Sequence, residues 1–205
     1  MCNKTYYRPS GHQQALRQSG VGMIEVLVAL LIVSVGFLNI AALQTTAKKS
    51  NFDSLQRTSA VILARDIAEK MRANPVELDG YLTDGGGVGG GTLGTPGTAC
   101  TTAARCATGQ LAVYDMWLWE QAMDGMSESR TLDGAATNTG GLVNPTGCIT
   151  GPAGGAAGVY TITIVWRGLN ELTNVSFNPC GVGSGKYGAT EQYRRISVLT
   201  TYISP

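Results

Sequence analysis

The segment Val21–Leu43 constrains this chain more than any other, because it is almost wholly apolar and carries a single charge, Glu25. As a helix rising about 1.5 Å per residue, it is long enough to cross the ~30 Å hydrocarbon core of a bilayer. The residues before it include the basic side chains Lys4, Arg8 and Arg17 and no acidic one. This positive flank predicts a cytoplasmic N-terminus and translocation of the rest of the chain.

The junction before the apolar segment differs from an ordinary secretory signal. A secretory signal has a short apolar core followed by a small-residue cleavage site, whereas here the small residue Gly20 precedes a long apolar run. A plain uncleaved anchor explains the length and the flanking charge but not Glu25. Because a carboxylate within a bilayer costs at least about 2.5 kcal/mol, we interpret Glu25 as a functional residue that needs a partner. The alternative is a chance glutamate at the membrane edge.

The junction resembles the class III signal of type IV prepilins over Gln18-Ser19-Gly20-Val21-Gly22-Met23-Ile24-Glu25-Val26-Leu27. In that family a prepilin peptidase cuts after the glycine and methylates the new N-terminal amine, and glutamate is the fifth mature residue. The resemblance therefore implies cleavage between Gly20 and Val21 and N-methylation of Val21. It also implies that Glu25 pairs with the N-terminal amine of a neighbouring subunit during assembly. Val21 and Gly22-Met23 depart from the usual Phe and Thr-Leu, but the spacing from glycine to glutamate is intact.

A second stretch narrows the resemblance to the PilV-type minor pilins, namely Arg65-Asp66-Ile67-Ala68-Glu69-Lys70-Met71-Arg72-Ala73-Asn74-Pro75. The first motif is shared with the minor pseudopilins of type II secretion. The resemblance implies an α+β pilin fold with a leader peptide at 1–20, a transmembrane assembly helix at 21–43 and a globular domain at 44–205. It implies a bacterial inner-membrane protein with a periplasmic domain that later enters a surface pilus. The implied partners are the prepilin peptidase, other major and minor pilins, the inner-membrane assembly machinery and membrane lipid.

The helical pattern continues past the apolar segment, since no proline occurs between Val21 and Asn74. Pro75 disfavours helical geometry at Asn74 and predicts the helix end there. We therefore predict one helix of about 53 residues, roughly 80 Å long. Its first half is apolar on all sides, and its second half is amphipathic and should lie on a globular domain. Two apolar stripes recur at helical spacing in the second half, one of Phe52, Leu55, Ser59 and Ile62 and one of Ala60, Ala64, Ile67 and Met71.

Four cysteines, Cys100, Cys106, Cys148 and Cys180, lie in the part predicted to be translocated. An even set in an oxidising compartment predicts two disulfides. Three pairings are possible, and we favour Cys100–Cys106 with Cys148–Cys180. A metal site is the weaker alternative, because there is no C-x-x-C pair and the single histidine lies in the leader. We expect no cofactor.

The middle of the chain contains a glycine-rich segment and a second helix. Residues 80–109 are rich in Gly and Thr and are predicted to be a mobile loop that buries no core. Residues Gln110–Met126 are predicted to form a helix with Leu111, Tyr114, Leu118 and Ala122 on one face. We interpret Trp117 and Trp119 as packing residues, with an aromatic ligand site as the alternative.

Two strands are clear from their alternation of residue types, Val159–Arg167 and Tyr193–Ile203, and a third is expected near Leu142–Asn144 or Leu172–Phe177. The predicted fold is α+β, with an antiparallel sheet packed on the second half of the long helix.

No catalytic constellation and no basic field for nucleic acid is evident in the sequence. Three functions follow: a minor pilin that primes or modifies pilus assembly, a type II secretion pseudopilin, or a membrane-tethered adhesin or binding protein.

Overall fold

A computed structural model of the chain describes residues 20, 22–83, 85–101, 104–126, 128–132, 135–173 and 176–204, with the backbone alone at 129, 132 and 135–137. The rest of the predicted leader and Val21 lie outside the described residues. The chain divides into two units, Met1–Thr46 and Ala47–Pro205. The sequence places the division between anchor and domain after Leu43, and that boundary stays a prediction.

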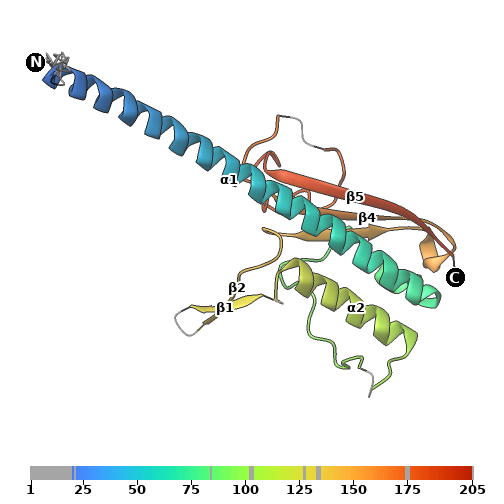
Figure 1. Ribbon diagram of the computed structural model, residues 1–205. Coiled ribbons are helices and arrows are strands. Elements are labelled where there is room, and N and C mark those ends of the chain that lie inside the picture. Colours follow the sequence, from blue (N-terminus) through green and yellow to red (C-terminus); the bar gives the residue numbers. More distant parts are fainter. Residues whose placement is uncertain are drawn as a thin grey trace, which may run out of the picture. The chain divides into compact units, whose positions relative to one another are not determined.

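The first helix, α1, runs from Met23 to Ala73 (Figure 1). This confirms the long helix predicted from the sequence, including its end before Pro75. Asn74, where the helix stops, has φ −128° and ψ 59°, a backbone conformation outside the helical region, as expected for a residue that precedes proline.

The two apolar stripes of α1 behave differently. All four residues of the Ala60 stripe are buried, with Ala60, Ile67 and Met71 at 0 % exposure. In the Phe52 stripe, Leu55 and Ile62 are 66 % and 60 % exposed. Only the Ala60 stripe therefore contributes to the core of the domain.

Two shorter helices follow, the 3₁₀ helix η1 (Pro75–Tyr81) and α2 (Thr108–Met123). The predicted second helix is confirmed, but it ends at Met123 and not at Met126, because Gly125 adopts φ +75° and turns the chain. The four residues expected on one face of α2, Leu111, Tyr114, Leu118 and Ala122, are half-buried. The buried residues of α2 are Ala112, Asp115, Met116, Trp119, Glu120 and Met123.

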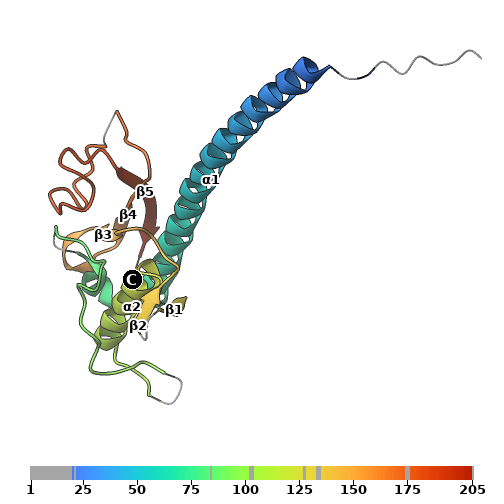
Figure 2. The same ribbon diagram turned by 90° about the vertical axis from the view of Figure 1, so that its left-hand side faces the viewer.

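The main sheet consists of β3 (Thr146–Thr150), β4 (Gly158–Arg167) and β5 (Arg194–Ile203), in the order β3-β4-β5 (Figure 2). Both strand pairs are antiparallel. The two predicted strands are confirmed to within one residue. The third lies at Thr146–Thr150 and begins two residues after Asn144, so it is near the first of the two expected places but does not include Leu142–Asn144. In the second place, Leu172–Phe177, the described residues form no strand, and residues 174 and 175 lie outside the described residues.

Three small elements complete the described secondary structure. The strands β1 (Ser129–Leu132) and β2 (Ala135–Asn138) pair antiparallel, with Leu132 opposite Ala135. The short 3₁₀ helix η2 (Ala153–Gly155) lies between β3 and β4. The sequence analysis did not predict any of these elements.

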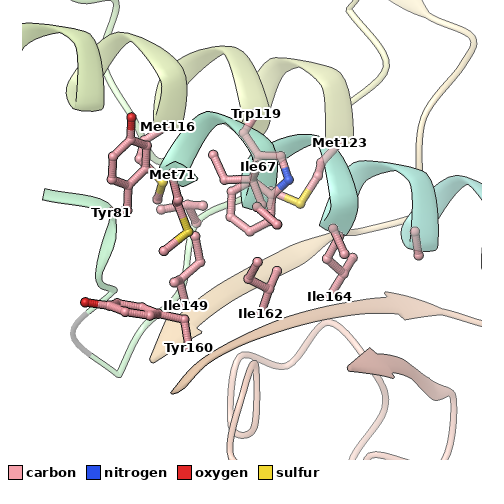
Figure 3. Close-up of a cluster of buried hydrophobic side chains, with 14 of the residues drawn as sticks. Ile67, Met71, Tyr81, Met116, Trp119, Met123, Ile149, Tyr160, Ile162 and Ile164 are labelled. Carbon is pink, nitrogen blue, oxygen red and sulfur yellow. The ribbon is translucent and has the colours of Figure 1, made fainter. Parts of the chain in front are cut away.

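The core of the domain lies where the second half of α1, α2 and one face of the main sheet meet (Figure 3). Ile67 and Met71 come from α1, Trp119 from α2, and Ile162 and Ile164 from β4, all nearly or fully buried. This arrangement confirms the α+β pilin architecture expected from the sequence.

Candidate functional site

The predicted processing and assembly residues lie at the start of α1. Gly20 is exposed, and a Cβ built there meets no atom within 4 Å. Glu25 lies exposed in the first turn of the helix, where its backbone N–H donates to the carbonyl of Gly22 at 2.9 Å. Among the described residues, no ion pair includes Glu25. The carboxylate is therefore available to a group outside this chain.

The apolar half of α1 is long and apolar enough to cross a membrane, and none of its most apolar 18-residue window is buried in the protein. Phe37 and Leu38, for example, are 67 % and 71 % exposed. An apolar surface of this length is unfavourable in water at about 25 cal/mol per Å². Contact with lipid or with another apolar surface would therefore lower its free energy.

The four predicted disulfide residues are paired as favoured in the sequence analysis. Cys100 is bonded to Cys106, six residues away, and Cys148 is bonded to Cys180, 32 residues away. The second disulfide joins β3 to the segment that leads into β5. With Val165 and Tyr187 it forms a small buried cluster on the face of β4 that points away from α1.

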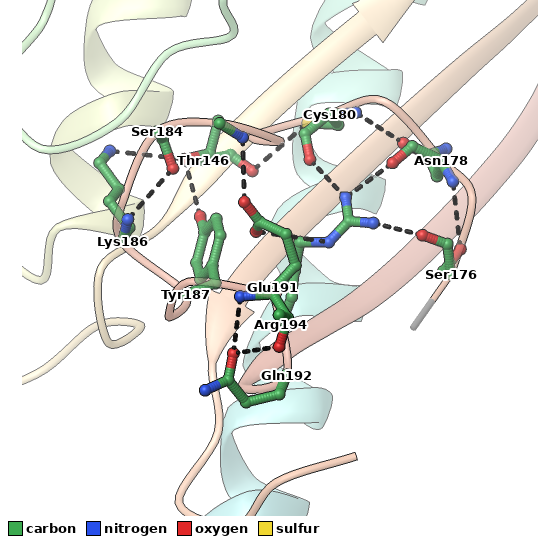
Figure 4. Close-up of polar contacts among 12 residues, drawn as sticks. Thr146, Ser176, Asn178, Cys180, Ser184, Lys186, Tyr187, Glu191, Gln192 and Arg194 are labelled. Atoms are coloured by element: carbon green, nitrogen blue, oxygen red, sulfur yellow. Dashed lines mark hydrogen bonds and ion pairs between the residues drawn. The ribbon is translucent and has the colours of Figure 1, made fainter. Parts of the chain in front are cut away.

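Arg194 fixes the segment that carries Cys180 (Figure 4). Its side chain is 3 % exposed, and its guanidinium donates to the backbone carbonyls of Ser176, Asn178 and Cys180. Glu191 lies 3.9 Å from its Nε. A buried charge is tolerated when hydrogen bonds replace its hydration, and here three carbonyls do so. Sequence reasoning missed this role, because an arginine at the start of a strand has no local signature of burial.

Tyr187 fixes the other side of the same segment. Its hydroxyl donates to Thr146 Oγ1 at 2.8 Å and lies 3.0 Å from the carbonyl oxygen of Asn144. Burial raises the pKa of Tyr187 to about 12. The neighbouring Lys186 donates from Nζ to the carbonyl oxygens of Gly89 and Pro145, both at 3.1 Å. Lys186 is thus engaged with the domain's own backbone.

The glycine-rich segment is tied to α2 by two carboxylates one helical turn apart. Glu120 is fully buried and accepts from the backbone N–H groups of Gly89, Thr92 and Leu93 at 2.6–2.9 Å. Asp124 accepts from the N–H groups of the next two glycines, Gly90 and Gly91, at 2.9–3.0 Å.

The same segment also contributes to the core. Val88 is 8 % exposed and forms an antiparallel bridge with Gly147 of β3. The prediction that residues 80–109 bury no core is therefore wrong at Val88 and also at Tyr81, which is fully buried in the core. The physical reason is that glycine allows a close approach of the backbone here. A Cβ at Gly89 would meet the carbonyl oxygen of Pro145 at 2.4 Å, so a residue with a side chain could not lie at this place, where the amide reaches Glu120.

The two tryptophans of α2 differ in their surroundings. Trp119 is fully buried, and its Nε1 donates to the carbonyl of Leu63 at 3.0 Å, so it is a packing residue as predicted. Trp117 is half-buried and stacks on Tyr114 with ring centroids 5.9 Å apart. It lines a cavity of about 430 Å³ whose other walls are apolar side chains and the backbone of the glycine-rich segment. Within the described part of the chain, no cluster of three metal-ligating side chains occurs.

Comparison with known proteins gives one match. A family described as "Tt1218-like: Type IV pilin Tt1218" matches residues 42–117, which cover the second half of α1, η1, the glycine-rich segment and the first part of α2. No curated protein and no solved structure matches the chain. Members of a pilin family are structural subunits that contact other pilins in a pilus. Together with the long apolar N-terminal helix and the three-stranded antiparallel sheet, this match supports the assignment of the chain to the type IV pilins.

Proposed function

We propose that the chain is a minor subunit of a type IV pilus, which primes or modifies pilus assembly and is made as a membrane-inserted prepilin. The observation that carries this proposal is the placement of Glu25. It lies exposed in the first turn of an unburied apolar helix, five residues after Gly20. An adhesin that is only tethered to the membrane has no need of this carboxylate.

The first step in this proposal is processing. A prepilin peptidase cuts between Gly20 and Val21 and methylates the amine of Val21. The leader at 1–20 is removed, the segment 21–43 remains in the inner membrane and the domain at 44–205 lies in the periplasm. The exposure of Gly20 supports access by the peptidase.

The second step is assembly through Glu25. In the membrane this carboxylate is costly, because its own helix offers no cation nearby. A neighbouring subunit can present its N-terminal amine and remove the penalty. Because this gain exists only in the assembled state, it favours filament entry over remaining in the bilayer. Major and minor pilins and the inner-membrane assembly machinery are the partners of this step.

Substitution of Gly20 tests the processing step. Gly20→Ala should be largely tolerated, and Gly20→Leu should block cleavage. Since a Cβ at this position meets no atom of the protein, a defect in Gly20→Leu reports on the peptidase and not on folding. The measurement is the mature N-terminus by mass spectrometry, in cells with and without the peptidase. An identical full-length mass in both strains would refute the processing step.

Substitution of Glu25 tests the assembly step. Glu25→Gln keeps the shape and loses the charge, so it should insert and be cleaved normally but be depleted from sheared filaments. Alternatively, it should reduce filament number if the subunit primes assembly. Glu25→Asp is the matched control, because it keeps the charge. If Glu25→Gln and Glu25→Ala both support wild-type piliation, the apolar helix alone drives assembly. Function without cleavage at Gly20 would favour the tethered adhesin.

A further inference from the structure

A polar pocket lies in the globular domain. Its walls come from residues 53–57 of α1, the end of β4 and the start of β5. It has a volume of about 290 Å³ and is lined by Asp53, Ser54, Arg57, Trp166 and Arg195. Trp166 and Arg195 are opposite each other in the antiparallel register of β4 and β5. Their side chains therefore leave the sheet on the same face, which is the face that packs on α1.

Three buried polar atoms in this pocket have no hydrogen-bond partner among the described residues. They are Nε1 of Trp166, Nη1 of Arg195 and Oδ1 of Asp53. Trp166 is only 2 % exposed, so its N–H cannot be hydrated as it would be at an open surface. An unpaired buried N–H costs about 1–3 kcal/mol. Of the six buried unpaired atoms in the described side chains, three are gathered at this one pocket.

The position of Arg195 is fixed by its surroundings. Its Nη2 donates to the carbonyl of Asn170 at 2.7 Å. The guanidinium lies against the backbone of Gly168, where a Cβ would meet Cζ of Arg195 at 2.7 Å. One edge of the guanidinium is therefore used by the protein, while Nη1 faces no acceptor.

The charges of the pocket leave one positive charge in excess. Asp53 contributes one negative charge, and Arg57 and Arg195 contribute one positive charge each. Nη1 of Arg195 and Nε1 of Trp166 are two donors without acceptors in one pocket, and a carboxylate offers two acceptor oxygens. The mouth is accessible, since Ser54 and Arg57 are exposed.

We propose that this pocket receives the carboxylate of an Asp or Glu side chain from a neighbouring pilin subunit, and that the lining side chains shift on binding so that Trp166 Nε1 and Arg195 Nη1, which are buried in the free subunit, donate to it. The occupant is a protein carboxylate because the chain is a pilin and other pilins lie beside it in a filament. That the carboxylate comes from a neighbouring subunit in a filament rests on the proposed function.

The chemistry of the pocket is tested without a filament. The full chain is purified in detergent with ¹⁵N-labelled tryptophan and titrated with N-acetyl-glutamate N′-methylamide, while the indole N–H resonances are followed by NMR. The Trp166 signal should move downfield and saturate. The signal of Trp119, whose N–H already donates to Leu63, should stay in place. The neutral glutamine analogue should give no shift. An equal shift with both probes, or none with either, overturns the carboxylate site.

The role in assembly is tested with two variants and a control. Arg195→Gln should lower the amount of this subunit in sheared filaments by about thirtyfold or more, as expected on loss of one partner of a desolvated charge pair. Trp166→Phe keeps the ring and removes only the N–H, so it should also lower incorporation. Its melting temperature should be unchanged or raised, because that N–H has no partner among the residues that the structure describes. Arg105→Gln, at an exposed position outside the pocket, should have no effect.

A photo-crosslinker at Ser54 identifies the occupant directly. The expected product in sheared filaments joins Ser54 to a peptide of another pilin that contains Asp or Glu. Wild-type incorporation of both Arg195→Gln and Trp166→Phe overturns the proposal and leaves the pilin function intact. If the wild-type subunit never enters filaments, the proposed function fails instead, and the NMR titration still decides the chemistry of the pocket.

Discussion

Replacement of Glu120 should release the glycine-rich segment from the domain. The carboxylate is fully buried and accepts four hydrogen bonds, three from backbone N–H groups and one from the hydroxyl of Thr92 at 2.5 Å. Glu120→Ala removes all four acceptor contacts. Glu120→Gln keeps the shape but turns one oxygen into a donor, which then faces either the N–H of Leu93 or those of Gly89 and Thr92.

The expected loss of stability follows from where these donors lie. Each hydrogen bond to a charged group contributes about 1.5–3 kcal/mol, but the four do not add. Once released, Thr92 is at the surface and Leu93 is half-exposed, so both amides can be hydrated. Only the amide of Gly89 is buried, and without Glu120 its one remaining acceptor is Oγ1 of Thr92 at 3.1 Å, which moves away when the segment is released. We therefore expect a loss of about 2–4 kcal/mol for Glu120→Ala.

Thermal unfolding followed by circular dichroism measures this loss. At about 2–4 °C per kcal/mol for a domain of this size, the melting temperature should fall by about 4–16 °C. Hydrogen exchange at the amides of Gly89, Thr92 and Leu93 should accelerate in the same variant. Asp124→Asn is the matched control. The Asp124 carboxylate accepts from the exposed amides of Gly90 and Gly91. Its replacement should therefore lower the free energy of unfolding by only about 0.5–1 kcal/mol. If Glu120→Ala melts like the wild type with unchanged exchange, the carboxylate does not hold the segment.

Three further changes have defined outcomes. Removal of the Cys148–Cys180 bond by two Cys→Ser changes should destabilise the domain by about 3.7 kcal/mol, and removal of the Cys100–Cys106 bond by about 2.4 kcal/mol. The difference arises because the first bond joins residues 32 apart and the second joins residues 6 apart. Urea unfolding without reductant measures both losses, and a larger loss for Cys100–Cys106 would contradict the loop argument. Gly125→Ala should lower the melting temperature sharply, since Gly125 has φ +75° and a Cβ there would meet the carbonyl oxygen of Gly140 at 1.9 Å, whereas Gly94→Ala, where a Cβ meets nothing, should not. Burial raises the pKa of Tyr187 from 10.0 to about 12, so its contribution to the free energy of unfolding should be fully present below pH 10 and be lost between pH 10 and 12. Unfolding of Tyr187→Phe should depend less steeply on pH in this range. An equally steep loss in the variant would exclude Tyr187 as its source.

Sequence reasoning succeeded where the determinants are local. The length of α1 and its end before Pro75 follow from apolar content and proline geometry. The alternation in β4 correctly places Tyr160, Ile162 and Ile164 in the core, because period two is a property of the strand itself. For β1 and β2, the usable signal was the dipeptide Asp133-Gly134 between two short runs, which is typical of a hairpin and was overlooked.

Sequence reasoning failed where a distant segment decides burial. The alternation in β4 does not predict that both of its faces are covered, yet Thr163 and Val165 on the second face are buried. They are covered by the segment that Cys180 joins to β3 and that Arg194 holds by its carbonyls. The third strand at Thr146–Thr150 was missed for a related reason. It contains a glycine and a disulfide cysteine, so its pairing with β4 depends on neighbours and not on β propensity.

The side chains that sequence reasoning missed share one property. Glu120, Arg194 and Arg195 are charged residues directed into the domain, and each binds backbone groups of a loop. Only 14 % of the chain is charged, so an inward charge here is not a by-product of a crowded surface. The loops of this domain are long and rich in glycine, which provides little apolar area to hold them down. Buried charges replace that missing area, because one carboxylate or guanidinium can fix several backbone groups at once. Arg194 and Arg195 each have one buried donor without a hydrogen-bond partner, Nε and Nη1. Glu191 Oε2 lies 3.9 Å from Nε of Arg194, whereas no ion pair among the described residues includes Arg195, and for that reason we place a partner's carboxylate at Arg195.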